Sequence, residues 1–193
     1  PGLKYMVARH DRAKDSKGTN DAVGAIVDFR NQLAARGIQL LVVPVPNKES
    51  IYHDHLIKRH KTFEPVVAPR TRELMERLRA EIIEVVDLFK EFRDARNSGY
   101  LYLAQDTHWS PIGVQVGARA VARRLMELGW IQPGQSEYRE QGAKVQRVGD
   151  ILRMLQSPGI EAGVTPESVS CVQVIRARDG KLYGDEATAE VLV

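Results

Sequence analysis

The sequence is poor in cysteine, and Cys171 is the only one among its 193 residues. A single thiol excludes an internal disulfide and a metal cluster held by several thiolates. Cys171 lies in VSCVQVI, whose alternation is typical of a strand, and this predicts a buried, unreactive thiol.

Long apolar runs and a strong net charge are also missing. No stretch approaches the ~18 apolar residues of a membrane span, and the opening PGLKYMVARH does not have the pattern of a signal sequence. The 28 basic and 25 acidic side chains give only +3, too little to favour nucleic acid as a partner. Basic residues gather at 58–61 and 70–79, which indicates solvated helix faces or, alternatively, a surface for an anionic polymer. The start at Pro1 suggests a processed or excised piece.

What is present is the composition of an ordinary globular protein, 43% hydrophobic and 27% charged, and we expect one domain over residues 1–193. Apolar spacing and caps predict helices, short Val- and Leu-rich runs predict buried parallel strands, and their alternation indicates an α/β layer fold. In chain order we expect a helix at 21–36 capped by Thr19 or Asn20, a strand in 38–46, a loop at 47–56, a helix at 69–80, a strand in 82–89, a short helix at 88–96, a helix at 111–128, an irregular stretch at 131–149, a short helix at 150–156, and two strand-like runs around the turn at 178–181.

The segment QDTHWSP, residues 105–111, is the best candidate for chemistry. If it is extended, Asp106 and His108 project to one side and Thr107 and Trp109 to the other. A carboxylate beside an imidazole can fix its tautomer and leave the second nitrogen as a base, which is half of a hydrolytic triad. Ser110 and Pro111 match the N-cap and first position of a helix, so capping would occupy the Ser110 hydroxyl.

Several other residues have both a functional and a structural interpretation. His53 and His55 in YHDHL suggest a metal site, but without a nearby third ligand they fit a polar loop, and we expect no metal. Lys48 follows the first strand, at the end where α/β folds place their sites, and it would hold substrate or lie on the surface. Tyr100 and Tyr102 would belong to the core or stack against sugar rings.

Three segments together resemble a known family. QDTHWSPIG with its following helix is similar to the Asp-x-His-Trp block of the alginate O-acetyltransferases. Residues 23–56 resemble that family's first helix and strand with a Pro-x-Pro-x-Lys loop, and VGDILRML at 148–155 resembles a Gly-Asp-Leu-x-x-Met segment. The resemblance implies an SGNH-hydrolase-like, three-layer α/β fold with a mostly parallel sheet.

The same resemblance implies roles for two residues. Asp106 corresponds to the residue that orients the base, and His108 to the general base. The family's nucleophilic serine lies later, in a Gly-Asp-Ser turn. None of the eight serines here has that context, and Gly184-Asp185 is followed by Glu186. We therefore expect the nucleophile beyond Val193, with the fragment truncated and inactive by itself.

The predicted function is thus polysaccharide O-acetylation through a Ser-His-Asp triad, with Asp106 and His108 as catalytic residues and Lys48 and Tyr102 as substrate-binding residues. The resemblance implies no cofactor. It implies as partners an anionic polysaccharide such as alginate, an acetyl donor or donor protein and membrane-associated secretion machinery, and as location the periplasm. Two alternatives stay open: a non-catalytic glycan-binding or assembly module, and a carbohydrate esterase with the same triad.

Overall fold

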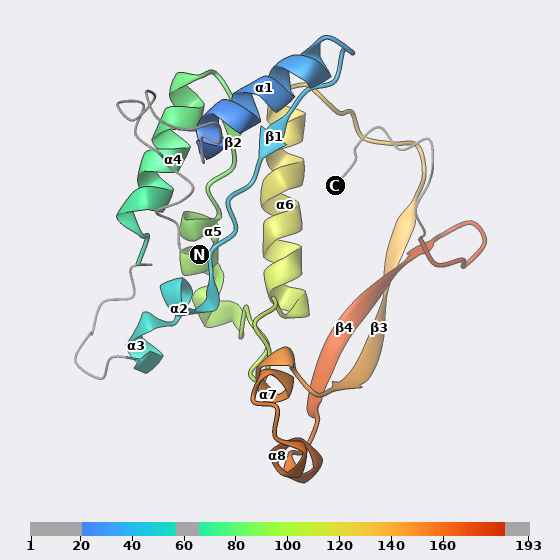
Figure 1. Ribbon diagram of the computed structural model, residues 1–193. Helices are drawn as coiled ribbons and strands as arrows, with labels where there is room; N and C mark the ends of the chain where they lie inside the picture. Colours follow the sequence, from blue (N-terminus) through green and yellow to red (C-terminus); the bar gives the residue numbers. More distant parts are fainter. Residues whose placement is uncertain (1–20, 57–65, 184–193) are drawn as a thin grey trace. The chain divides into compact units, whose positions relative to one another are not determined.

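The computed structural model of the protein describes residues 21–56 and 66–183. The chain divides into two compact units, Pro1–Arg93 and Asp94–Val193. The first contains a short parallel strand pair with helices, and the second contains a long antiparallel pair with a 17-residue helix (Figure 1). The α/β class expected from the sequence is confirmed, and each unit is described separately below.

The first unit is built around one parallel strand pair. Strand β1 (Leu41–Val42) pairs with β2 (Glu84–Val85) in parallel, in the two segments where the sequence predicts strands. Both strands are only two residues long and half-buried, so they are shorter and less buried than expected. Helices α1 (Ala22–Ala34) and α4 (Pro69–Ala80) enclose the core of this unit, made of Val23, Leu74, Leu78 and Ile83.

Two further expectations about the first unit are wrong. Helix α1 is capped by Asp21, whose carboxylate accepts a hydrogen bond from the Val23 N–H, and not by Thr19 or Asn20. The predicted loop at 47–56 instead forms two short helices, α2 (Lys48–Ile51) and α3 (His53–Leu56). Asn47 explains the first of these, because its extended backbone starts the turn and its side chain bonds Ser50. Helix α5 (Leu88–Ala95) appears as predicted and runs across the boundary between the units.

In the second unit the 3₁₀ turn η3 (Arg96–Ser98) leads to a loop and then to helix α6 (Pro111–Glu127). The predicted cap is confirmed, since the Ser110 hydroxyl accepts from the Gly113 N–H at 3.2 Å and Pro111 occupies the first turn. The buried side of α6 is made mainly of small residues, Gly113, Gly117 and Ala120, together with Leu125. Ile112 is exposed, and Gly113 instead lies against the backbone at Leu101.

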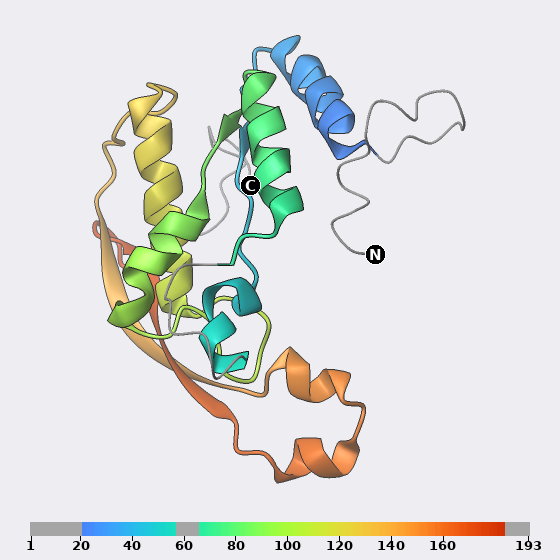
Figure 2. The same cartoon turned by 90° about the vertical axis from the view of Figure 1, so that its left-hand side faces the viewer.

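The long antiparallel pair is the main feature that the sequence did not predict. Strand β3 (Tyr138–Arg147) pairs with β4 (Glu167–Arg176) along its whole length. The connection between them contains helices α7 (Asp150–Met154) and α8 (Pro158–Gly163), which lie at one end of the pair (Figures 1 and 2). The predicted run in β4 and the short helix at 150–156 are confirmed. The run after the turn at 178–181 forms a single bridge, Leu182 to Ile175, and its remainder lies outside the described residues.

Candidate active site

The Asp-x-His segment lies in a tight loop and not in an extended strand. An antiparallel bridge joins Tyr102 to Trp109, and the Leu103 N–H donates to the His108 carbonyl at 3.2 Å. The loop closes on itself through Asp106, whose Oδ1 accepts from the His108 backbone N–H at 3.0 Å. This is the local turn that Asp forms with the backbone two residues on. The predicted proximity of acid and imidazole is therefore correct, but a turn produces it.

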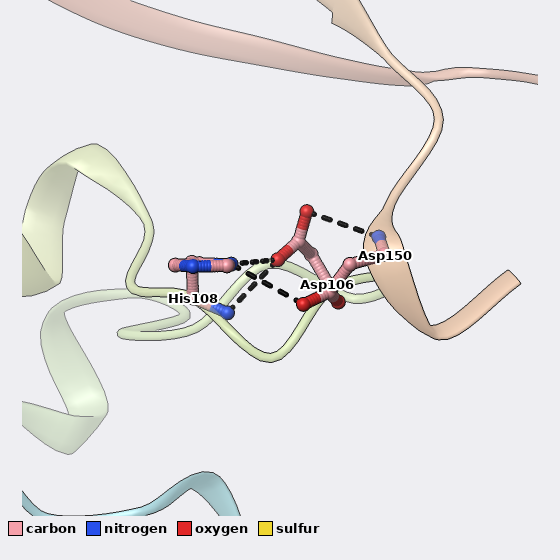
Figure 3. A group of neighbouring side chains, drawn as sticks. All are labelled: Asp106, His108 and Asp150. Atoms are coloured by element: carbon pink, nitrogen blue, oxygen red, sulfur yellow. Dashed lines mark hydrogen bonds and ion pairs between the residues drawn. The ribbon is translucent and has the colours of Figure 1, made fainter. Parts of the chain in front are cut away.

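The acid and the imidazole are in direct contact. His108 Nδ1 lies 2.5 Å from Asp106 Oδ1 (Figure 3). The Asp106 side chain is 1% exposed, whereas that of His108 is 68% exposed. With Nδ1 directed at the carboxylate, Nε2 is the nitrogen left to exchange protons with another group. The pair thus combines a fixed buried anion with an accessible base.

Two further residues bond the outer oxygen of Asp106. Arg147 Nε donates to Oδ2 at 3.0 Å and the Asp150 backbone N–H donates at 3.2 Å. Burial by itself raises the pKa of Asp106, but the hydrogen bonds from His108, Asp150 and Arg147 outweigh it and hold the pKa well below its ordinary value. Asp106 is therefore an anion throughout the physiological range, as an orienting carboxylate must be.

A second carboxylate faces the same imidazole nitrogen. Asp150 Oδ2 lies 3.4 Å from His108 Nδ1 (Figure 3). Thr107 holds this carboxylate in place, since its backbone N–H donates to Asp150 Oδ1 at 2.7 Å and its hydroxyl donates to Oδ2. Thr107, which an extended segment would direct away from the pair, is thus connected to it through Asp150.

The end of β3 and the start of α7 fit closely against the site loop because of Gly149. A Cβ at this position would overlap the Gln105 carbonyl and lie 2.8 Å from the Asp106 nitrogen. On the other side, the Glu167 carboxylate accepts from the N–H groups of Ala104 and Gln105 at 3.0 and 3.2 Å. The loop is therefore held from both ends of the β3–β4 connection.

The three residues Asp106, His108 and Asp150 each offer an atom within 4.8 Å of the others, a spacing that a metal ion could use. Their hydrogen bonds favour a different interpretation. The Arg147 guanidinium already supplies a positive charge to Asp106, and both oxygens of Asp150 accept from Thr107. An acid and base cluster therefore explains these contacts better than a cation site.

The other predicted residues lie elsewhere. Lys48 begins α2 in the first unit, and its substrate role stays a prediction. Tyr102 is 3% exposed and its hydroxyl accepts from Trp109 Nε1 at 3.0 Å, which fits an anchor for the loop, while a contact with sugar stays a prediction. His53 is buried, and the ring of His55 lies tilted against that of Tyr52 with ring centroids 5.3 Å apart.

Ser110 and Cys171 have structural surroundings. The Ser110 hydroxyl both caps α6 and donates to the Tyr100 carbonyl, so it is engaged as expected. Cys171 is half-buried and not fully buried, contrary to expectation. It lies where α6 and the β3–β4 pair leave an open, mostly apolar groove of about 560 Å³, whose lining includes Trp109, Val114, Val145, Arg147, Cys171 and Val174.

Sequence reasoning missed the parts that the β3–α7 junction brings to the site. Arg147, Gly149 and Asp150 lie about forty residues after the loop, and no spacing rule connects the two. Gly149 and Asp150 do fall in the VGDILRML segment noted for its resemblance, but that resemblance assigns them no role.

The helices in the described part of the chain are too short or too polar to cross a membrane.

Known proteins with similar sequences point to one family. The family model described as SGNH hydrolase-like domain, acetyltransferase AlgX, matches residues 5–193. A curated relative, the probable alginate O-acetylase AlgJ of Pseudomonas aeruginosa, is 27% identical over 129 residues, which are 65% of this chain and 32% of the relative. The chain thus spans about a third of the length of that relative.

Solved structures agree on the fold. The O-acetyltransferase domain of Pseudomonas putida AlgJ superposes with a TM-score of 0.66 at 19% identity, covering 81% of this chain and 56% of that one. Pseudomonas aeruginosa AlgX gives 0.62 at 18% identity, covering 81% and 39%. The expected SGNH-hydrolase-like α/β fold is confirmed. The chain belongs to the family of SGNH hydrolase-like acetyltransferase domains typified by AlgX.

Proposed function

We propose that this protein takes part in O-acetylation of a polysaccharide and supplies Asp106 and His108 to a Ser-His-Asp triad. The observation that carries the proposal is the 2.5 Å contact between a buried, anionic Asp106 and an imidazole that is 68% exposed. Membership of a family of acetyltransferase domains, and relatives named alginate O-acetylases, support the type of reaction.

In the proposed reaction, His108 Nε2 accepts the proton of the serine hydroxyl as its oxygen attacks the acetyl carbonyl of the donor. The proton then passes to the leaving group of the donor, and an acetyl-serine ester remains. A sugar hydroxyl next attacks this ester and gives its proton to His108. The serine oxygen then leaves the acetyl group and takes this proton back from His108. Asp106 stays ionised and stabilises the imidazolium in both steps.

The nucleophilic serine comes, in this proposal, from sequence beyond Val193, as the resemblance implies. Ser110 is a poor candidate because helix capping and the Tyr100 carbonyl occupy its hydroxyl. We further propose that residues 1–193 form a single domain, consistent with a family match over residues 5–193.

The proposed partners are an anionic polysaccharide such as alginate, an acetyl donor or donor protein, and membrane-associated secretion machinery, with the periplasm as location. The names of the relatives support alginate as the polysaccharide. We also propose that Lys48 and Tyr102 contact the substrate.

The test is a His108→Ala substitution in the full-length protein, with turnover of a chromogenic acetyl ester as the readout. We expect a loss of at least about 10²-fold in kcat, the lower range for removing a general base. His55→Ala is the matched control, because it removes an exposed imidazole that lies against Tyr52 in the first unit. Unchanged turnover in the His108 variant would remove this residue from the mechanism.

The alternatives predict different results in the same system. An esterase releases acetate at a rate that does not change when alginate oligosaccharides are added, whereas a transferase yields acetylated oligosaccharide. A binding module retains glycan without turnover, and that retention survives His108→Ala and weakens with salt.

A further inference from the structure

Asp150 is a half-buried carboxylate that points at the candidate base. Its side chain is 24% exposed, and Oδ2 lies 3.4 Å from His108 Nδ1. The two donors of Thr107 hold both of its oxygens, while its own backbone N–H bonds Asp106. Asp150 therefore touches each of the other two residues of the cluster.

We propose that Asp150 is a positioning residue that acts through His108, as a second carboxylate on Nδ1. The inference rests on the proposed function, because it takes His108 as the general base. A neutral imidazole has two tautomers, and only the one protonated at Nδ1 leaves Nε2 free to accept a proton. Nδ1 makes its hydrogen bond to Asp106, and the Asp150 oxygen 3.4 Å away adds a second negative charge that favours a proton at Nδ1 and stabilises the imidazolium.

The charges around the ring support this division of roles. Arg147 pairs with Asp106 on the oxygen that faces away from His108. Among the described residues, Asp150 accepts hydrogen bonds from the neutral donors of Thr107 and lies in ion-pair range of His108. Its negative charge therefore acts mainly on the imidazole. Glu167, another carboxylate bound to the site loop, accepts from the backbone of Ala104 and Gln105.

A purely structural role for Asp150 would be to join α7 to the loop, which it does through its backbone N–H to Asp106 and through its side-chain oxygens to Thr107. The backbone bond survives a change of side chain, and an amide oxygen at position 150 can still accept from the Thr107 N–H. Asp150→Asn keeps the size of the side chain and the backbone bond, and it removes the negative charge. The variant therefore separates positioning of the imidazole from attachment of α7.

The direct test is ¹⁵N NMR of the imidazole nitrogens in the 193-residue protein, with the His108 signal assigned from its loss in His108→Gln. In the wild type we expect the tautomer protonated at Nδ1 to dominate. In Asp150→Asn we expect its ratio to the other tautomer to fall roughly two- to fivefold, the size of one charge interaction at a partly exposed site. Asp179→Asn is the matched control, since Asp179 lies in the turn after β4 and should leave the ratio unchanged.

Thr107 provides a second pair of variants should Asp150→Asn fail to fold. Thr107→Val removes the hydroxyl that anchors Asp150 and should lower the ratio in the same direction, whereas Thr107→Ser keeps the hydroxyl and should preserve it. In the full-length protein, Asp150→Asn should lower kcat roughly two- to fivefold with KM unchanged, because it removes one of the two negative charges that stabilise the imidazolium formed in the reaction and does not contact substrate.

A folded Asp150→Asn or Thr107→Val with the wild-type tautomer ratio would overturn the inference. The tautomer readout does not need turnover, so the two proposals fail separately. A shifted ratio in a protein that transfers no acetyl group would contradict the proposed function and support the placement of the ring by Asp150.

Discussion

Gly149→Ala is expected to detach the β3–α7 junction from the site loop. The backbone of Gly149, at φ −74° and ψ 164°, suits any L residue, so the effect is one of space and not of conformation. The added Cβ would overlap the Gln105 carbonyl oxygen and lie 2.8 Å from the Asp106 nitrogen, where a real carbon does not approach so closely. These neighbours are backbone atoms, and they can yield only if the two segments separate.

The magnitude follows from what that separation breaks. Four hydrogen bonds cross here: those from Arg147 and the Asp150 N–H to Asp106, at 3.0 and 3.2 Å, and those from the Thr107 N–H, at 2.7 Å, and the Thr107 hydroxyl to Asp150. An opening of about 1 Å lengthens all of them beyond hydrogen-bond range. Overpacking costs about 1–3 kcal/mol, and each bond to a charged group adds about 1.5 kcal/mol or more, part of which water restores. We expect the free energy of unfolding to fall by about 3 kcal/mol, and Tm by roughly 6–12 °C in a protein of this size.

The assay is urea unfolding followed by circular dichroism, with amide hydrogen exchange at Thr107 as the local readout. Gly142→Ala is the control, because a Cβ there meets no atom within 4 Å. Gly149→Ala should lose both stability and protection at Thr107, whereas Gly142→Ala should keep them. Equal stability of the two variants, with Thr107 still protected, would refute the close fit of the junction.

Two further predictions concern the loop and its helix. The lowered pKa of Asp106 stabilises the fold at pH values above the ordinary carboxyl pKa, and this contribution is lost as pH falls toward the folded-state pKa. The difference in unfolding free energy between the wild type and Asp106→Asn should therefore be largest near pH 7 and shrink below about pH 4. A difference that is independent of pH between 7 and 2 would contradict the assignment. Ser110→Ala removes the N-cap of α6 and the bond to the Tyr100 carbonyl, so urea unfolding should show a loss of about 1–2 kcal/mol. Thr at the same position should restore most of that loss, and a fully stable Ser110→Ala would mean that another group caps the helix.

The sequence predicts those features that local chemistry determines. Helix α4 begins and ends at the predicted residues, because Pro69 suits a first turn and the apolar spacing places Leu74 and Leu78 inward. Helix α6 likewise follows from Ser110 and Pro111. The contact of Asp106 with His108 was also predictable, since residues two apart are close in a strand and in an Asp turn alike.

The features that the sequence does not predict depend on contacts between residues that are far apart in the chain. Strand β3 is polar and exposed on nearly every residue, so it lacks the apolar alternation by which a strand is recognised, and only its pairing with β4 reveals it. Arg147 and Asp150 reach Asp106 through that pairing. In α6 the small Gly113 is buried while Ile112 is exposed, because Gly113 allows the Leu101 backbone to approach, and helical spacing does not reveal such a contact.

The central claim is that Asp106 and His108 serve an acyl-transfer serine. Its most direct measurement is the rate at which the full-length protein acquires a covalent acetyl group from an acetyl ester, followed by intact-protein mass spectrometry in the wild type and in His108→Ala. We expect rapid acetylation of a serine in the wild type and a rate at least about 10²-fold lower in the variant. Equal rates in the two proteins would contradict the account.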